Sequence, residues 1–316
     1  MKTTTLTNPF AEDVTKGLTA SPKFLPSKYF YDDRGSRIFM EIMAMPEYYP
    51  TGCEFEILSQ QSPAIVNELP FTAPFNIIEF GCGDGMKTKH LLKAFMEHGV
   101  PFTYIPIDIS QEAIDVLEAN INLALPGIDM QPQTGDYFEA LTGIDSGKPA
   151  LFLFLGGNIG NYKDAEAIAL LEKFHTQMKA GDMLLMGMDL QKNPRVIQKA
   201  YDDSYGVTKS FNMNLLTRIN RELDADINLD QFDFYCDYNP QNGEVNSYLV
   251  SLKKQHVHSA LLNTTFYFEK DELVWTELSK KYTLESITTL AGSAGFNVVH
   301  NFMDCMHYFT DSLWIK

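Results

Sequence analysis

The sequence is poor in the residues that build metal clusters and disulfide networks. It has four cysteines in 316 residues, at positions 53, 82, 236 and 305, and no two of them form a C-x-x-C pair. Cysteines so far apart argue against a zinc cluster and a disulfide framework, and they predict free buried thiols. His256 and His258 alternate in one segment, but no third ligand lies nearby in the sequence, so we expect no bound metal.

Long apolar runs and an excess of positive charge are also missing. No stretch approaches the roughly 20 apolar residues of a membrane span, and the N-terminal MKTTTLTNPFAEDVTKGL lacks the apolar core of a signal peptide. Lysine and arginine number 25 against 41 aspartates and glutamates, a net charge of −16. Such a surface repels phosphate backbones and anionic lipids. We therefore expect a cytoplasmic protein with a small-molecule partner, no nucleic acid and no membrane contact. We also expect a monomer.

What the sequence does have is an alternation of apolar runs with segments of helical spacing. The apolar runs lie at 75–80, 102–109, 149–155 and 183–190, and the helical segments between them lie at 86–98, 110–124 and 164–180. Strands that alternate with helices favour an α/β fold with a doubly wound parallel sheet and right-handed crossovers.

The alternation stops after Asp189. Helical stretches follow around 193–204 and 213–224, extended segments at 246–253 and 264–269, and then a helix at 283–292 and a strand at 296–303. We therefore predict a Rossmann-like domain formed by 55–192 plus 282–316. The second, α+β domain is predicted to bind the substrate and to consist of 8–54 plus 193–281.

Residues 77–92, IIEFGCGDGMKTKHLL, join the first strand to the first helix through glycines at alternate positions. Enzymes that use NAD, FAD or S-adenosylmethionine have such a turn, and similar glycine-rich turns also occur with a purely structural role. A dinucleotide site requires G-x-G-x-x-G, whereas this turn is E-F-G-C-G-D-G. Glu79 and Asp84 are expected to place carboxylates where a pyrophosphate would bind. A cationic ligand without phosphates, such as S-adenosylmethionine, fits better.

Two aspartates follow the glycine turn in the order expected of a nucleoside site. Asp108 ends the second apolar run, where its carboxylate can accept both ribose hydroxyls, although it could also belong to the cap of the next helix. Asp136, in GDYF at 135–138, precedes a helix and could face an adenine edge together with a backbone amide. The ordered set of Gly81, Asp108 and Asp136 indicates an S-adenosylmethionine-dependent methyltransferase.

The fourth apolar run ends in FLFLGGNIGNY at 152–162. Gly156 and Gly157 allow another backbone to approach closely. Asn158 and Asn161 offer amide donors and acceptors at the sheet edge where ligands of open α/β folds bind. The alternative is a polar turn that caps the following helix.

Several longer motifs carry a family resemblance. They are LPSKYFYDDRGSRIFMEIMAMPEYYPTGCEFEIL (25–58), EFGCGDGMKT, YIPIDIS, FLGGNIGN, GDMLLMGMDLQK (181–192), AYDDSYGVTKSFNMNLL (200–216) and TELSKKY (276–282). Together they resemble the histidine-specific, S-adenosylmethionine-dependent methyltransferases of ergothioneine biosynthesis. The resemblance runs from about residue 24 to the C-terminus, and PEYYPT with YDDRGS is its most specific part.

The resemblance implies roles for individual residues. The residues implied to contact S-adenosylmethionine are Tyr31, Gly81, Lys87, Asp108, Asp136 and Tyr137. Those implied to bind the amino-acid substrate are Tyr48, Gly156, Asn161, Tyr201, Glu277 and Ser279. Within the second set, Tyr48, Asn161 and Tyr201 would hold the amino and carboxylate groups, with Asn161 and Tyr48 as the catalytic pair, while Glu277 and Ser279 would face the side chain.

The implied reaction is methylation of the α-amino nitrogen of L-histidine, through to the trimethyl betaine, hercynine. Two alternatives stay open: methylation of another amino acid such as tryptophan, and a homologue that binds the cofactor without catalysis. Relatives often carry Ile-Glu-Met where this chain has Val245, Asn246 and Ser247. Ser247 would leave a wider or wetter pocket for the substrate ring, so strict histidine selectivity does not follow from the motifs.

Overall fold

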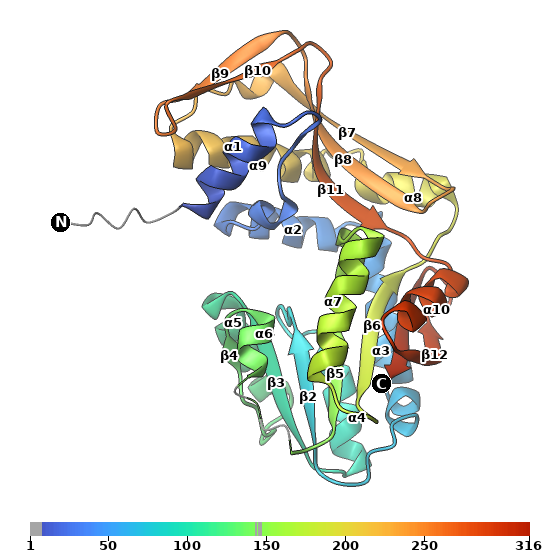
Figure 1. The fold of residues 1–316 in the computed structure, drawn as a ribbon. Coiled ribbons are helices and arrows are strands. Elements are labelled where there is room, and N and C mark those ends of the chain that lie inside the picture. The colour runs from blue at the N-terminus through green and yellow to red at the C-terminus, as the bar shows by residue number, and fades with distance from the viewer. Residues whose placement is uncertain (1–7, 143, 145–146) are drawn as a thin grey trace, which may run out of the picture. The chain divides into compact units, whose positions relative to one another are not determined.

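The structure is a computed structural model that describes residues 8–142, 144 and 147–316. The chain forms two compact units (Figure 1). The large unit consists of Tyr49–Gln191 and Lys280–Lys316, and the small unit of residues up to Tyr48 together with Lys192–Ser279. The chain therefore passes from one unit to the other three times. Across the described residues, we find no helix with both the length and the apolar character needed to cross a lipid bilayer.

The large unit is built on a seven-stranded sheet in the order β12-β13-β6-β5-β2-β3-β4. The five strands from β6 to β4 pair in parallel, whereas β13 pairs antiparallel with both β6 and β12. The strands are β2 Phe75–Phe80, β3 Phe102–Asp108, β4 Gln133–Thr134, β5 Ala150–Phe154, β6 Met183–Asp189, β12 Asn297–Met303 and β13 Phe309–Ile315. This sheet confirms the predicted α/β class.

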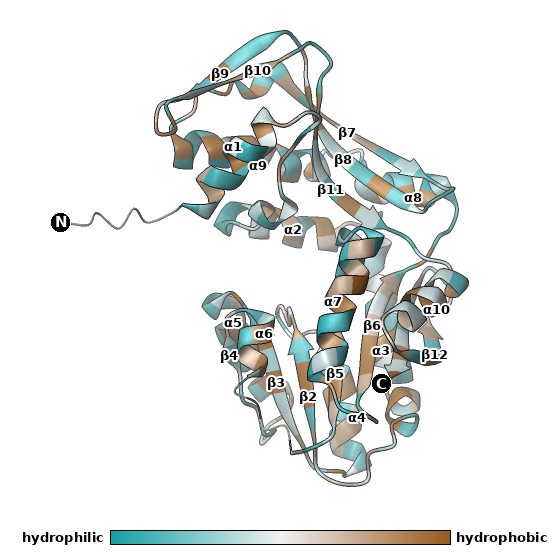
Figure 2. Ribbon diagram, in the orientation of Figure 1, coloured by the Kyte–Doolittle hydropathy of each residue, from teal (hydrophilic) through white to brown (hydrophobic). Residues whose placement is uncertain are grey.

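Helices cover both faces of this sheet. Consecutive residues of β2, such as Ile77 and Ile78, point into two separate hydrophobic clusters because side chains alternate along a strand. Helices α3, α4 and α5 contribute to the first cluster, and α6, α7 and α10 to the second. In Figure 2, α7 carries both teal and brown residues, as expected of a helix with one face on the sheet. The helices are α3 Tyr49–Asn67, α4 Thr88–His98, α5 Gln111–Ala124, α6 Tyr137–Leu141, α7 Asp164–Gln177 and α10 Leu284–Ser293, with the 3-10 turn η2 at Asn158–Asn161.

The small unit has a four-stranded sheet in the order β1-β11-β8-β7 and a separate antiparallel pair, β9 and β10. Buried and half-buried residues alternate along β8, so one face of this sheet is buried. Helix α9 covers that face, with Phe211 and Leu215 in one cluster with Leu249. The elements are α1 Pro9–Thr19, β1 Lys23–Phe24, η1 Ser27–Phe30, α2 Asp33–Ala44, α8 Pro194–Tyr201, α9 Val207–Leu223, η3 Leu229–Gln231, β7 Phe232–Asn239, β8 Glu244–Ser251, β9 Gln255–Ser259, β10 Thr264–Phe268 and β11 Leu273–Lys280.

The unit boundaries differ from the predicted domain ranges at their ends. Residues 49–54, which the sequence predicts to be part of the second domain, belong to the large unit. The physical reason is that α3 runs unbroken from Tyr49 and buries Ile57 and Leu58 in the core beneath the sheet. Residues 280–281 also belong to the large unit, and Lys192 belongs to the small one. A substrate-binding role for the small unit stays a prediction.

Candidate functional site

The glycine turn follows β2 directly and has a backbone that only glycine adopts without strain. Gly81, Gly83 and Gly85 have φ angles of 66°, 55° and 69°. A Cβ atom on Gly81 would lie 2.8 Å from the hydroxyl of Tyr137, and one on Gly85 would lie 3.1 Å from the side chain of Ile121. The turn is therefore held close to α6 and α5 at two of its glycines.

Glu79 does not have the position that we expected for it. Its side chain is buried and accepts hydrogen bonds from the Thr88 hydroxyl, at 2.6 Å, and from the Tyr104 hydroxyl. Burial raises the pKa of Glu79 to about 7, although both hydrogen bonds lower it. Asp84 accepts a hydrogen bond from the backbone N–H of Met86 within the turn. The expectation that Glu79 faces the ligand is therefore wrong, because this carboxylate joins β2 to β3 and α4.

Asp108 is the last residue of β3, at the sheet edge where it was predicted. Its Oδ1 accepts a hydrogen bond from the backbone N–H of Ser110 at 3.0 Å, and Ser110 in turn caps α5. Its Oδ2 makes no hydrogen bond to any residue in the described part of the chain. The half-buried carboxylate thus has one oxygen in the turn and a second that can accept from a ligand.

Asp136 and Tyr137 stand at the start of α6. Asp136 is the N-cap, and its Oδ1 accepts from the backbone N–H groups of Phe138 and Glu139 at 2.9 and 3.3 Å. The ring of Tyr137 packs against Phe80 at a centroid distance of 5.2 Å. Burial raises the pKa of the Tyr137 phenol, so the phenol is a hydrogen-bonding group and not a charge at neutral pH.

The turn after β5 combines two unusual glycines with an available amide. Gly156 and Gly157 have φ angles of 81° and 72°. The side chain of Asn158 donates to the backbone oxygen of Leu155 at 3.1 Å and so closes the turn. Asn161, which ends η2, is half-buried, and its side-chain amide makes no hydrogen bond with a residue that the structure describes. Asn161 is therefore able to bind a ligand with both its oxygen and its nitrogen.

Lys87 forms an ion pair that the sequence did not indicate. Its ammonium pairs with the carboxylate of Glu54, which is 1% exposed. Glu54 also accepts a hydrogen bond from the backbone N–H of Gly156 at 2.6 Å, so one carboxylate joins α3 to α4 and to the turn after β5. A Cβ atom on Gly187 would clash with Glu54, which explains a glycine in the middle of β6. The predicted contact of Lys87 with the cofactor stays a prediction.

Asp311 of β13 is a second carboxylate that sequence analysis missed. It is fully buried, and neither of its carboxylate oxygens has a hydrogen-bond partner in the described part of the chain. Burial, and next the nearby Glu54, raise its pKa well above the usual range, so we expect it to be protonated. No sequence pattern indicates this carboxylate, because Asp311 is paired with β6 only in the folded chain.

Four predicted substrate residues gather in the small unit. The hydroxyl of Tyr201, at the end of α8, lies 3.0 Å from that of Ser279 on β11. The ring of Tyr48 contacts the ring of Tyr201 edge to face, at a centroid distance of 5.9 Å. Glu277 precedes Ser279 by two residues on the same strand, so both side chains point to one face of the sheet. The other two predicted substrate residues, Gly156 and Asn161, belong to the large unit.

Tyr31 is the one predicted cofactor residue in the small unit. Its ring packs edge-on against Phe39 and Phe211, at centroid distances of 5.4 and 5.6 Å, yet 47% of the residue is exposed. The aromatic contacts fix the ring, and the exposure leaves part of it available to a ligand.

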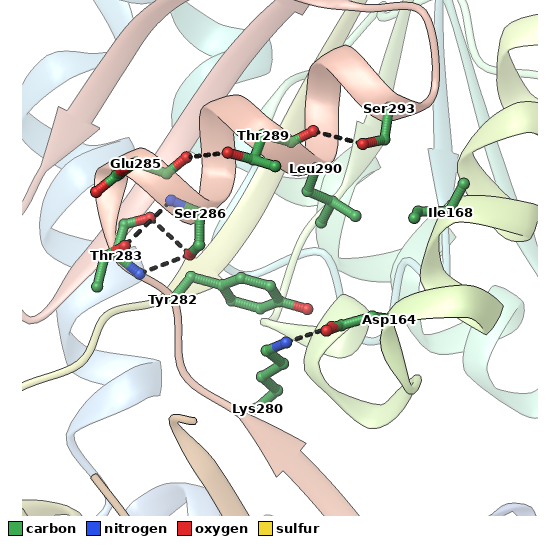
Figure 3. Close-up of a pocket in the computed structure, with 10 residues that line it drawn as sticks. All are labelled: Asp164, Ile168, Lys280, Tyr282, Thr283, Glu285, Ser286, Thr289, Leu290 and Ser293. Carbon is green, nitrogen blue, oxygen red and sulfur yellow. Dashed lines mark hydrogen bonds and ion pairs between the residues drawn. The ribbon is translucent and has the colours of Figure 1, made fainter. Parts of the chain in front are cut away.

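Two other groups of side chains do not qualify as the site. A surface pocket of about 370 Å³ between α7 and α10 is lined by none of the predicted site residues (Figure 3). Its lining hydroxyls are already engaged: those of Thr283 and Ser286 hydrogen-bond at the start of α10, and that of Tyr282 donates to the backbone oxygen of Ile159. Glu56, Asp304 and Cys305 lie close enough to share a metal ion, but the oxygens of Asp304 already accept from three backbone N–H groups.

Comparison with known proteins gives one family over nearly the whole chain. The family described as "Histidine-specific methyltransferase, SAM-dependent" matches residues 10–316. The match includes both units and every residue assigned above to a cofactor or substrate role.

Three relatives illustrate the range of that similarity. A histidine N-alpha-methyltransferase from Mycolicibacterium smegmatis is 36% identical over 304 residues, 96% of this chain and 94% of that protein. Ergothioneine biosynthesis protein 1 from Schizosaccharomyces pombe is 28% identical over 291 residues, 88% of this chain and 37% of that protein. An L-tryptophan methyltransferase from Psilocybe serbica is 28% identical over 318 residues, 92% of this chain and 88% of that protein.

Proposed function

We propose, from the premise that this chain belongs to the histidine-specific, S-adenosylmethionine-dependent methyltransferase family, that it methylates the α-amino nitrogen of L-histidine. The observation that carries the proposal is the extent of the family match, which includes the residues of both the donor and the acceptor sets. The sequence similarity to a histidine N-alpha-methyltransferase over 96% of the chain supports the same substrate.

The residues at the edge of the large sheet fit a nucleoside ligand. Asp108 has a carboxylate oxygen available for ribose hydroxyls, and the backbone at Gly81 leaves no room for a side chain beside Tyr137. S-adenosylmethionine supplies a methyl group on a sulfonium, which is already an activated leaving group. We assign Asp108 to the ribose, Asp136 and Tyr137 to the adenine side, and Gly81, Lys87 and Tyr31 to the remaining contacts.

The protein's own task in this reaction is alignment and selection of the neutral amine. An α-amino group is mostly protonated at pH 7, and only the neutral form has a lone pair to offer. The Asn161 amide and the Tyr48 phenol can hold that form by hydrogen bonds without stabilising a positive charge. Fixing the nitrogen in line with the methyl group then supplies most of the rate acceleration. The proton lost in each round leaves with solvent.

We assign Tyr201 to the substrate carboxylate and Glu277 and Ser279 to the imidazole. A neutral imidazole has one N–H donor and one nitrogen acceptor. A carboxylate can take the donor while a serine hydroxyl donates to the acceptor, so both edges are satisfied. The hydrogen bond between Tyr201 and Ser279 supports this assignment, because it links a residue of the carboxylate group with one of the side-chain group.

We further propose that methylation continues to the trimethyl betaine. Each round removes one hydrogen-bond donor from the nitrogen, and the remaining contacts to the carboxylate and imidazole keep the intermediate in place. The similarity to an ergothioneine biosynthesis protein supports this product. The expectations of a monomer and of a cytoplasmic location stay predictions.

Tryptophan is the second candidate substrate, because a relative of comparable coverage is named as an L-tryptophan methyltransferase. An indole offers one N–H but no acceptor for the Ser279 hydroxyl, which makes Glu277 and Ser279 a better match for histidine. A homologue without catalysis is disfavoured, since Tyr48, Asn161 and Tyr201 are all present.

The direct test is to incubate the protein with S-adenosylmethionine and each common amino acid separately, and to follow the mass of the amino acid. We expect histidine to gain up to three methyl groups on its α-nitrogen, as located by fragmentation. Methylation of a ring nitrogen, or of another amino acid in preference, would overturn the proposal.

A further inference from the structure

The three passages of the chain between the units begin beside one buried cluster in the large unit. They lie between Tyr48 and Tyr49, between Gln191 and Lys192, and between Ser279 and Lys280. The first segment of the large unit begins with Tyr49, and Asp189 lies two residues before its end. Lys281 is the second residue of the other segment. The side chains of Tyr49 and Lys281 both contact that of Asp189.

Asp189, the last residue of β6, is the centre of this cluster. The hydroxyl of Tyr49 lies 3.0 and 2.9 Å from its two carboxylate oxygens. The ammonium of Lys281 lies 2.8 Å from Oδ2. The side chains of Lys281 and Asp189 are 1% and 5% exposed, so both charges are shielded from water and depend on each other.

The backbone around Asp189 is fixed as firmly as its side chain. The N–H of Tyr282 donates to the backbone oxygen of Asp189, and the N–H of Gln191 donates to that of Tyr282, each at 2.8 Å. Asp189 is also paired with Phe309 of β13. The segment that follows β11 is therefore hydrogen-bonded to the end of β6 at Asp189.

The segment after β11 has two further attachments to the large unit. Lys280 pairs with Asp164 at the start of α7, as the dashed line in Figure 3 shows. The hydroxyl of Tyr282 donates to the backbone oxygen of Ile159, in the η2 turn that ends at Asn161. Tyr282, the residue after Lys281, thus stabilises the turn that carries Asn161.

The residues next to these attachments are those assigned to the substrate. Tyr48 is covalently adjacent to Tyr49, and Ser279 and Glu277 precede Lys281 by two and four residues. We propose that Asp189 is a positioning residue for the methyl acceptor, acting through Tyr49 and Lys281. It fixes the points from which Tyr48 and the end of β11 extend. This inference rests on the proposed function, since it assigns an effect on the amino-acid substrate.

If Asp189 served only to stabilise the fold, the expected kinetics would be different. A buried carboxylate that only stabilises the fold should change the melting temperature and leave the kinetic constants of the folded enzyme alone. A positioning residue should lower kcat/KM for the amino acid, because a displacement of about 1 Å at a reacting group can reduce the rate about a hundredfold. The cofactor residues Gly81 and Asp108 lie at the ends of other strands, β2 and β3, so cofactor affinity should not change.

The test compares Asp189→Asn and Tyr49→Phe with Asp182→Asn. Asp182 is a matched control: it is equally buried, immediately precedes the other end of β6, and accepts from the backbone N–H groups of Ala150 and Lys179. Tyr49→Phe removes a single hydroxyl and leaves the buried ion pair intact, so it remains informative if Asp189→Asn fails to fold. Steady-state kinetics with histidine and calorimetry with S-adenosylhomocysteine are measured for each variant.

We expect Asp189→Asn and Tyr49→Phe to lower kcat/KM for histidine, the former by at least about tenfold, with affinity for S-adenosylhomocysteine within about twofold of wild type. Asp182→Asn should be less stable but kinetically normal. Unchanged kcat/KM in a folded Asp189→Asn and in Tyr49→Phe, or a parallel loss of cofactor affinity, would overturn the inference.

A second readout separates this inference from the choice of substrate. Hydrogen exchange of the segments 46–50 and 278–283 needs no amino acid, and it should become faster in Asp189→Asn but not in Asp182→Asn. If the wild-type protein methylates another amino acid, faster exchange and a lower kcat/KM with that substrate would still support the positioning role. Unchanged exchange in those segments would contradict it.

Discussion

At the scale of single residues, several side chains of the candidate site already form hydrogen bonds with the backbone. Asp108 gives one carboxylate oxygen to the Ser110 amide, and Asp136 gives one to the first turn of α6. The carboxylates are thereby oriented before any ligand binds, which lowers the entropy lost on binding. Asn161 differs, because its position comes from the η2 backbone and its amide remains available.

The ribose assignment predicts a loss of cofactor affinity in Asp108→Ala. The change removes the acceptor for two charge-assisted hydrogen bonds, so affinity for S-adenosylhomocysteine should fall at least about tenfold, or about 1.4 kcal/mol. Ser110→Ala is the matched control: it removes the cap of α5, which should cost about 1 kcal/mol of stability and leave affinity intact. Calorimetry that finds wild-type affinity in a folded Asp108→Ala protein would place the ribose elsewhere.

The amine assignment predicts the opposite behaviour for Asn161. Asn161→Ala should lower kcat/KM for histidine by about a hundredfold or more, because the nitrogen is no longer held in line with the methyl group. Affinity for S-adenosylhomocysteine should stay within about twofold. Asn161→Asp, which has nearly the same shape, should favour the protonated amine and shift the pH optimum upward. An equal loss of cofactor affinity and activity would assign Asn161 to the cofactor instead.

At the scale of elements, strands with continuous apolar runs were predicted most accurately, and several strands with mixed composition were missed. The first four predicted strands agree with β2, β3, β5 and β6 to within one residue at each end, because strands buried on both faces need apolar residues throughout. β7, β11 and β13 were missed. β7 is partly exposed along its length, and β13 has Thr310, Asp311 and Ser312 in its centre, so neither shows a regular pattern.

Glu79 links three elements, and its raised pKa predicts a pH dependence of stability. The folded state raises its pKa from 4.5 to about 7, so it holds a proton that the unfolded chain releases. Stability from this group is therefore present below about pH 4.5 and is lost as pH rises toward 7. The total loss is about 3 kcal/mol.

Urea unfolding of wild type and Glu79→Gln at several pH values between 4.5 and 8 measures this effect. The difference in unfolding free energy between the two proteins should shift by about 3 kcal/mol in favour of Glu79→Gln as pH rises. Thr88→Val removes a donor to the ionised form, so it should increase the pH dependence. Parallel curves for wild type and Glu79→Gln would show that Glu79 has an ordinary pKa in the folded protein.

At the scale of the whole molecule, the two sets of candidate residues differ in how they could be found. The order of Gly81, Asp108 and Asp136 along alternating strands indicated a methyltransferase from the residues alone. Tyr48 and Tyr201 belong to a set of 15 tyrosines, and no spacing distinguishes them. Tyr201 and Ser279 meet although they are 78 residues apart, which only the fold can bring about. The substrate residues could therefore be identified only from the family motifs. Neither the residue patterns nor the family motifs indicated the roles of Glu54, Asp311 and Asp189.

Selectivity is likewise a property of the whole molecule, because donor, acceptor and side-chain residues must act together. A substrate that lacks the imidazole groups cannot form the hydrogen bonds that we assign to the Glu277 carboxylate and the Ser279 hydroxyl. Such a mismatch costs on the order of a few kcal/mol, which corresponds to a preference of about a hundredfold or more.

The measurement that tests this account most directly is a competition between equal concentrations of histidine and tryptophan, with products identified by mass. We predict that the native protein methylates histidine at least about a hundredfold faster than tryptophan. In Glu277→Ala, the preference should shift toward tryptophan, because the carboxylate that we assign to the imidazole N–H is then absent. A native preference for tryptophan, or an unchanged preference in Glu277→Ala, would contradict the assignment of histidine as the substrate.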